Sequence, residues 1–158
     1  MFKSLIDLFD TLAPDDAFRG ARGGAPSLPL AAAVLLVEVM RADADSSGVE
    51  RAAVRKALTA LFAMADDEAD ALTAQAERTA RMASDLFAFT SPIDERWDMS
   101  VKLRLIELMW GVAYADGQLG DIERHTMLRI ADLLHIPQGA CYHARIRAKA
   151  AAGLGDDD

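Results

Sequence analysis

The chain has 158 residues, a formal net charge of −8 at pH 7 and 52% hydrophobic residues. A single domain of this length can bury roughly 70% of its unfolded surface, so it can hold a full core unaided. The excess of carboxylates repels phosphate backbones, which argues against nucleic acid as a partner and favours cations or basic protein surfaces. The single cysteine, Cys141, cannot form an internal disulfide, and this fits a reducing compartment.

Residues 1–13 are predicted to form an amphipathic helix, because apolar side chains recur in them at helical spacing. The polar face carries one lysine against Asp7 and Asp10, whereas membrane-surface helices are usually basic. We therefore expect this helix to dock on its own domain or on a protein partner, and a membrane-associated partner stays open. The same aspartates interrupt a signal-peptide pattern, and no apolar run is long enough to span a bilayer. We expect a cytoplasmic protein without a transmembrane segment.

Residues 14–28 are rich in Gly and Pro and are predicted to be a linker. A helical domain follows over residues 29–152, and residues 153–158 form an acidic tail. Within the domain the apolar spacing predicts seven helices, the fourth a short turn that begins at Thr90. We expect the other six at residues 29–42, 48–64, 67–87, 99–115, 121–135 and 138–152. No strand pattern occurs, so the fold class is all-α.

Two of these helices, residues 29–42 and 99–115, are apolar almost all round, which predicts a central position in the core. The single acids within them, Glu38 and Glu107, are expected to pair with Arg41 and Arg104, each three residues away on the same helix. The alternative is a metal or catalytic role. The other helices carry an apolar stripe. In the stripes of residues 48–64, 67–87 and 121–135 we expect Val49, Met82 and Ile122, respectively, to face inward.

Two segments share a helix–acidic turn–helix pattern, and we call them the first acidic corner (residues 43–50) and the second acidic corner (residues 116–123). In each, an Ala-Asp pair ends an apolar run and a Glu-Arg pair follows at the same spacing. Asp43 and Asp116 therefore fall at predicted helix C-termini, where a carboxylate faces unpaired carbonyls and the negative end of the helix dipole. A hard cation removes that conflict by binding both kinds of oxygen. The alternative is that Asp is simply a good turn residue.

Glu50 and Glu123 fall in the first turns of the helices that follow the corners, where acids are favourable in any case. Ser47 and Glu50 match a capping box, so Glu50 is either a cap or a cation ligand. Gly120 offers no side-chain cap in the second corner. We therefore expect Asp121 to cap that helix, which makes Glu123 the better ligand candidate.

Other site patterns are incomplete. Asp43 and Asp45 match the first and third positions of an EF-hand loop, but Val54 stands where the bidentate Glu is needed. A true EF-hand is therefore excluded, whereas a more open acidic site is not. The three histidines are too scattered for a zinc signature, and there is no phosphate-binding Gly-rich loop.

Four segments of the chain resemble the TerB (tellurite-resistance protein B-like) family: Leu36–Asp43, Leu86–Thr90, Leu108–Glu123 and Arg129–Leu134. Together the resemblance covers about Leu30 to Ala144. The second acidic corner, Ala-Asp-Gly-Gln-Leu-Gly-Asp-Ile-Glu, is its specific part. The resemblance implies a single-domain helical bundle of about seven helices with an internal pseudo-repeat of the helix–acidic turn–helix unit.

The resemblance also implies that acids from both corners share one face and bind a divalent cation. Carried over by position, the candidate ligands are Asp43, Glu50, Asp116 and Glu123, to which we add Asp45, the second acid of the first turn. Oxygen ligands favour Ca²⁺ or Mg²⁺, and no other cofactor is expected.

We expect a non-enzymatic, TerB-like domain that binds this cation and has an interaction or scaffold role in a tellurite-type stress response. A metal-free module that attracts a basic partner with its acidic face is the alternative. A carboxylate-based, metal-assisted hydrolase ranks last, because the sequence offers no recognisable nucleophile or His base.

Overall fold

The computed structural model describes residues 26–42 and 48–154. Within these ranges the regular structure is entirely helical, which confirms the all-α prediction. The seven helices there are α3 (Leu28–Arg41), α4 (Gly48–Phe62), α5 (Asp66–Met82), α6 (Phe87–Arg96), α7 (Met99–Ala113), α8 (Asp121–Leu133) and α9 (Gln138–Ala151). The predicted N-terminal helix lies outside the described residues, as do Asp43 and Asp45.

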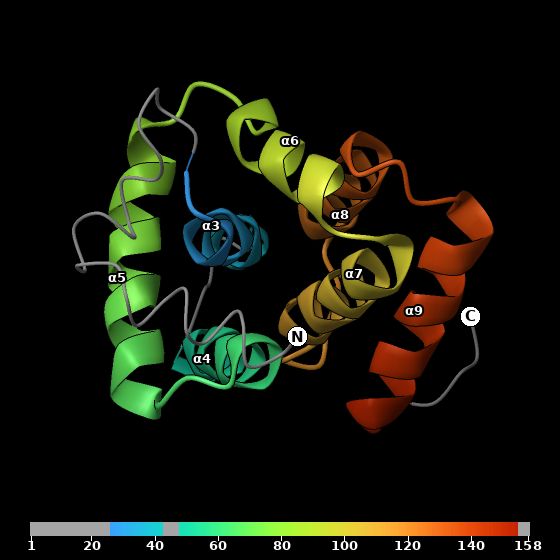
Figure 1. Ribbon diagram of the computed structural model, residues 1–158. Coiled ribbons are helices and arrows are strands. Elements are labelled where there is room, and N and C mark those ends of the chain that lie inside the picture. Colours follow the sequence, from blue (N-terminus) through green and yellow to red (C-terminus); the bar gives the residue numbers. More distant parts are fainter. Residues whose placement is uncertain (1–25, 43–47, 155–158) are drawn as a thin grey trace.

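Helix α3 occupies the centre of the domain. Viewed along its axis, it is enclosed by α4, α5 and α6 and by the pair formed by α7 and α8 (Figure 1). The N-terminus of α3 is set by Ser27, whose Oγ accepts a hydrogen bond from the Leu30 amide at 3.3 Å, with Pro29 in the first turn. Every side chain from Leu28 to Val37 is buried. A helix that is apolar all round is thus surrounded on all sides, as predicted.

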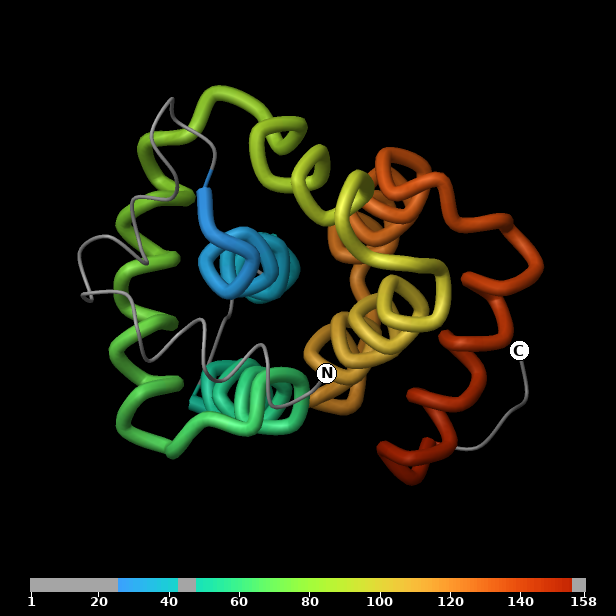
Figure 2. Tube along the Cα trace, viewed as in Figure 1, coloured from blue at the N-terminus to red at the C-terminus, as the bar shows by residue number. Residues whose placement is uncertain are grey.

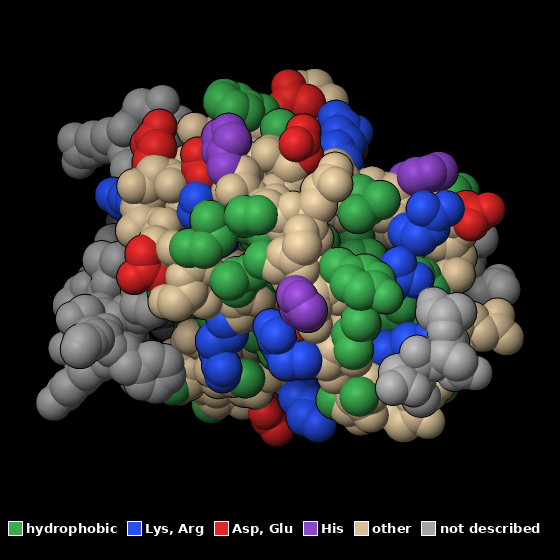
Figure 3. Space-filling model, turned by 90° about the vertical axis from the view of Figure 1, so that its right-hand side faces the viewer, with side chains coloured by type: hydrophobic (Ala, Val, Ile, Leu, Met, Phe, Trp, Pro, Cys, Tyr) green, Lys and Arg blue, Asp and Glu red, His purple; other side chains and the backbone are tan. Residues whose placement is uncertain are grey.

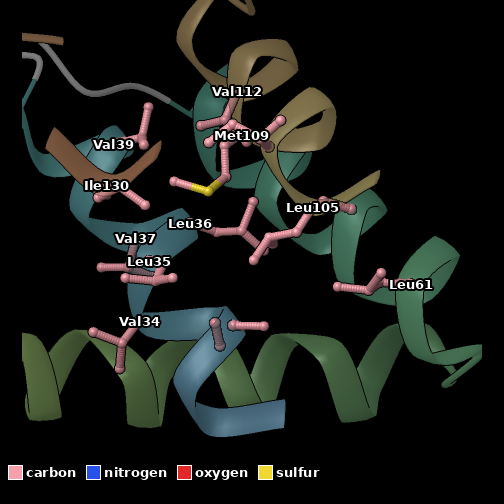
Figure 4. Close-up of a cluster of buried hydrophobic side chains, with 14 of the residues drawn as sticks. Val34, Leu35, Leu36, Val37, Val39, Leu61, Leu105, Met109, Val112 and Ile130 are labelled. Carbon is pink, nitrogen blue, oxygen red and sulfur yellow. The ribbon is translucent and has the colours of Figure 1, made fainter. Parts of the chain in front are cut away.

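Helix α7 is the second central element. It packs on α3, α4, α8 and α9, and the tube view shows α9 lying outside it, at the edge of the domain away from α5 (Figure 2). Side chains from α3, α4, α7 and α8 meet in one cluster, in which Leu36 of α3 points toward Leu105 of α7 (Figure 4). Leu36, Leu105 and Met109 are all fully buried. The core is therefore built from both halves of the chain.

Some local predictions were wrong. Helix α5 ends at Met82 rather than near residue 87, because Ala83 is extended (φ −79°, ψ 139°). The Asp85 carboxylate then accepts a hydrogen bond from the Phe87 amide at 2.9 Å, which starts α6 as a full helix instead of a short turn. Three apolar side chains that we expected inside are exposed: Val49, Met82 and Ile122.

The acidic residues of the two central helices, Glu38 and Glu107, differ in where their ion-pair partners lie. Glu38 pairs with Arg41 at 3.0 Å, as predicted. The prediction for Glu107 was wrong, because its carboxylate accepts from Arg147 Nε of α9 at 2.8 Å. Arg104 instead donates to the Ala60 carbonyl at 3.4 Å. Tertiary partners thus replace the neighbour on the same helix.

A buried lysine joins α6, α7 and the end of α8. Lys102 is 7% exposed, and its Nζ donates to Asp94 Oδ1 at 2.5 Å and to the Leu134 carbonyl at 3.0 Å. His135 Nδ1 lies 2.9 Å from the other oxygen of Asp94. The pKa of Asp94 is held below its usual range, first by the hydrogen bond from Lys102 and then by that from His135. This network fixes three helices to one another.

None of the helices in residues 26–42 and 48–154 has both the length and the apolar composition needed to cross a membrane.

Candidate functional site at the acidic corners

The two helices that precede the acidic corners, α3 and α7, have their C-termini at the same end of the domain. Helices α3 and α7 run in the same direction, with Val34 and Leu105 toward one end and Val39 and Val112 toward the other (Figure 4). The first corner follows the C-terminus of α3, and the second corner follows the C-terminus of α7. The helix ends that lead into the two corners therefore do not lie at opposite ends of the fold. A site shared between them stays geometrically open.

Glu123 is 3% exposed and belongs to the first turn of α8. Its Oε1 accepts a hydrogen bond from the backbone N–H of Gly120, the N-cap residue, at 2.9 Å. The prediction that Asp121 caps this helix was wrong, because Asp121 is already its first residue and its carboxylate points to solvent, 3.5 Å from Arg124. Glu123 thus has a structural role as half of a capping box.

Glu50 occupies the equivalent place in the first unit. It lies in the first turn of α4 and is fully buried, with 0% of its surface exposed. Val49 beside it is exposed, so the helix turns its acid inward and its apolar neighbour outward. Burying a carboxylate is costly unless hydrogen bonds or positive charge compensate it. A role in keeping the protein surface soluble therefore does not explain these two glutamates, which are buried at matching positions.

Asp116 has a different environment. It is exposed, and its Oδ1 accepts a hydrogen bond from the Gln118 amide at 3.1 Å across the turn. Gly117 between them has φ +88°, a conformation that glycine adopts without strain. Asp116 therefore makes the local turn contact expected of a good turn residue.

The described candidates do not complete a metal centre among themselves. In residues 26–42 and 48–154, no three His, Cys, Asp or Glu side chains are grouped closely enough to hold a metal ion. Glu50, Asp116 and Glu123 fall within those ranges, whereas Asp43 and Asp45 do not. A cation shared by the corners would therefore need Asp43 or Asp45 of the first acidic corner as a ligand.

Two grooves were not predicted as sites. One of about 660 Å³ runs between α4, α7 and α9, with small side chains such as Ala57 and Ala148 along it and Asp116 at its rim. The other, of about 650 Å³, lies between α8 and α9 and is lined by Trp110 and Arg145 among others. Periodicity within one helix could not reveal either groove, because each is lined by residues of helices distant in sequence.

The fold and the corners define a class: an all-helical domain with two helix–acidic turn–helix units, each with a buried glutamate in the first turn of its second helix. Residues 29–146 match the family model described as tellurite resistance protein TerB. The chain belongs to the TerB family. Neither a search of curated proteins nor a search of solved structures gave a match. The match to the family model confirms the family resemblance drawn from the sequence.

Proposed function

We propose that this TerB-family domain is a non-enzymatic binding domain whose acidic end binds a divalent cation. The ligands would come from Asp43, Asp45, Glu50, Asp116 and Glu123. The observation that carries the proposal is the pair of buried glutamates, 0% and 3% exposed, that are the last residues of the two corners. A cation between the corners would offset the cost of concentrating carboxylates there.

The chemistry of the donor set fits a hard cation. All five side chains offer carboxylate oxygens, which suit Ca²⁺ or Mg²⁺ better than Zn²⁺. Glu123 Oε1 is already engaged with the Gly120 amide, so this residue would bind through its other oxygen. The ion would supply positive charge that holds the two turns together. A domain ordered in this way would serve as an interaction or scaffold module in a stress response of the kind the family description indicates.

Thermal melts in Ca²⁺ or Mg²⁺ against chelator test the cation. At a hundredfold excess over Kd, a bound ion is expected to raise the free energy of unfolding by about 2.7 kcal/mol. Asp43→Asn, Asp45→Asn and Asp116→Asn should each reduce this metal-dependent increment. Asp121→Asn is the matched control, because it removes an 88% exposed carboxylate in the second corner that is not among the proposed ligands.

Two outcomes would count against the proposal. Equal melting temperatures in chelator and in each cation would remove the metal altogether. A metal-dependent increment that survives all three ligand substitutions would place the ion elsewhere. Comparing melts with and without metal for each variant is essential, because weakening the turn contact between Asp116 and the Gln118 amide lowers stability on its own.

A metal-free interaction module is the second candidate function. The groove between α4, α7 and α9 favours it, because small side chains line much of it and its charged lining has two acids, Glu107 and Asp116, against one base, Lys56. A basic protein partner would fit that charge. Capture of such a partner that is unchanged by chelator, together with melts that ignore metal, would favour this candidate over the cation site.

The described residues offer little support for catalysis. Cys141 is buried, and burial raises the pKa of its thiol, although the Trp110 indole and the charge of Arg145 oppose the rise. A protonated, buried thiol is a poor nucleophile. His135 is engaged with Asp94, remote in sequence from both corners. Turnover in a hydrolase screen that is lost with Asp116→Asn would reinstate the metal-assisted hydrolase.

A further inference from the structure

The groove between α8 and α9 exists because these helices each pack on α7 and barely touch one another. Its volume is about 650 Å³, within the range of small-molecule sites. Its apolar walls come from Leu128 of α8, from Ile136 between the two helices and from Tyr142 of α9. Trp110 of α7 also lines it. Leu128 and Tyr142 are 46% and 56% exposed, so two large side chains border the groove without burying themselves in the core.

Arg145 is positioned in this groove by two contacts. Its guanidinium carbon lies 5.3 Å from the centroid of the Trp110 ring, and its Nε donates to the Tyr114 hydroxyl at 2.8 Å. No carboxylate among the described residues pairs with it, and its two terminal nitrogens have no acceptor there. Arg129 on the α8 side also has no ion pair among those residues. Arg81 and Arg96 also have no ion pair among the described residues, so the distinguishing feature of Arg129 and Arg145 is their shared place in the groove. On this side of the molecule, hydrophobic side chains lie beside Lys and Arg (Figure 3).

Trp110 adds a second polar group to the same place. Its ring is 1% exposed, and its indole nitrogen is buried without an oxygen or nitrogen acceptor among the described residues. The neighbouring Cys141 offers only a thiol, which is a weak acceptor. A buried donor without a good acceptor is costly. The groove thus combines apolar walls with the terminal nitrogens of Arg145, which have no acceptor among the described residues, and with an indole N–H that has only a weak one.

We propose that this groove binds a small organic anion, a carboxylate on an aromatic or aliphatic body. The carboxylate would be held by the terminal nitrogens of Arg145, whose planar fork matches two carboxylate oxygens. The apolar body would lie along Leu128, Ile136 and Tyr142. Asp132 at the edge of the groove carries the opposite charge, so it disfavours dianions and leaves a single carboxylate as the best fit. The site is separate from the cation proposal and does not depend on it.

The indole N–H of Trp110 allows a direct test by ¹⁵N NMR of the full chain. Two indole signals are expected, one for each tryptophan, and a Trp97→Phe spectrum assigns them. Titration with 4-phenylbutyrate and octanoate should shift the Trp110 signal with saturation and leave the Trp97 signal in place, because Trp97 packs against Phe62 instead. The primary amides of the same two compounds should bind about tenfold more weakly or worse.

Substitutions in α9 separate this site from general effects. Arg145→Gln should weaken 4-phenylbutyrate about tenfold or more, and Arg145→Lys should fall between, because it keeps the charge and loses the fork. Arg147→Gln is the matched control, since Arg147 pairs with Glu107 away from the groove. Thermal melts establish that each variant is folded.

The proposal is overturned by any of three results: no saturable shift with either carboxylate, equal binding of the amides, or full binding by Arg145→Gln. An acidic helical peptide that shifts the Trp110 signal where both small carboxylates fail would also overturn it, in favour of a protein partner.

Discussion

Leu36→Ala is expected to lower the free energy of unfolding by about 3–4 kcal/mol. Leu36 is fully buried on α3 and meets side chains of α7 in the cluster where both halves of the chain converge (Figure 4). Removing its side chain forfeits transfer free energy and leaves a cavity, because α3 is enclosed on all sides and cannot shift toward any one neighbour. Urea denaturation followed by circular dichroism measures the loss.

The control for this prediction is Leu128→Ala, the same chemical change at a helical site that is 46% exposed. It should cost at most about 0.5–1 kcal/mol, since most of that side chain is already hydrated. Similar losses for the two variants would contradict the central placement of α3.

Asp94→Asn is expected to cost about 3 kcal/mol. The substitution keeps the size of the side chain and an oxygen that can accept a hydrogen bond, but it removes the charge opposite Lys102, a residue that is only 7% exposed. Removing one member of a buried ion pair leaves the other charge uncompensated. Glu95→Gln, on the exposed side of α6, is the matched control and should be nearly neutral.

The same network has a defined pH dependence. Because the folded-state pKa of Asp94 lies below its usual value, its contribution to stability is present above the unfolded pKa and is lost as pH falls through the folded pKa. The difference in unfolding free energy between the wild type and Asp94→Asn should therefore shrink on acidification through the carboxyl range. A difference that stays constant there would mean that the Asp94 charge is not what stabilises these helices.

Sequence patterns predicted the helices well where burial is uniform and poorly where local contacts decide. The all-round apolar character of residues 29–42 indicated a central helix, and α3 is central. The C-terminus of α5 was missed because the break at Ala83 depends on an extended backbone and on the Asp85 cap of α6. Glu107 was assigned the wrong partner because Arg147 is distant in sequence and becomes a neighbour only after α9 packs on α7.

For the candidate site, the sequence revealed the repeat but not the burial of its acids. The matching spacing singled out Glu50 and Glu123, yet no pattern indicated that both would be shielded from water. Nor could spacing show that Glu123 bonds the Gly120 amide, since either Asp121 or Glu123 could cap that turn. The α8–α9 groove was missed for a different reason: Trp110 and Arg145 become neighbours only through tertiary packing.

The enclosure of α3 has a consequence for how the two repeated units depend on each other. One side of α3 is covered by α4 and α5, and the other by α6, α7 and α8, which come later in the chain. A fragment that ends between α5 and α6 would leave half of α3, the most apolar helix, exposed to water. The contacts of α3 with α4 and α5 alone cannot offset the free-energy cost of that exposure. The halves should therefore be insoluble or unfolded when expressed alone and recover structure only when mixed. The two helix–acidic turn–helix units therefore repeat a sequence pattern, but they fold only together.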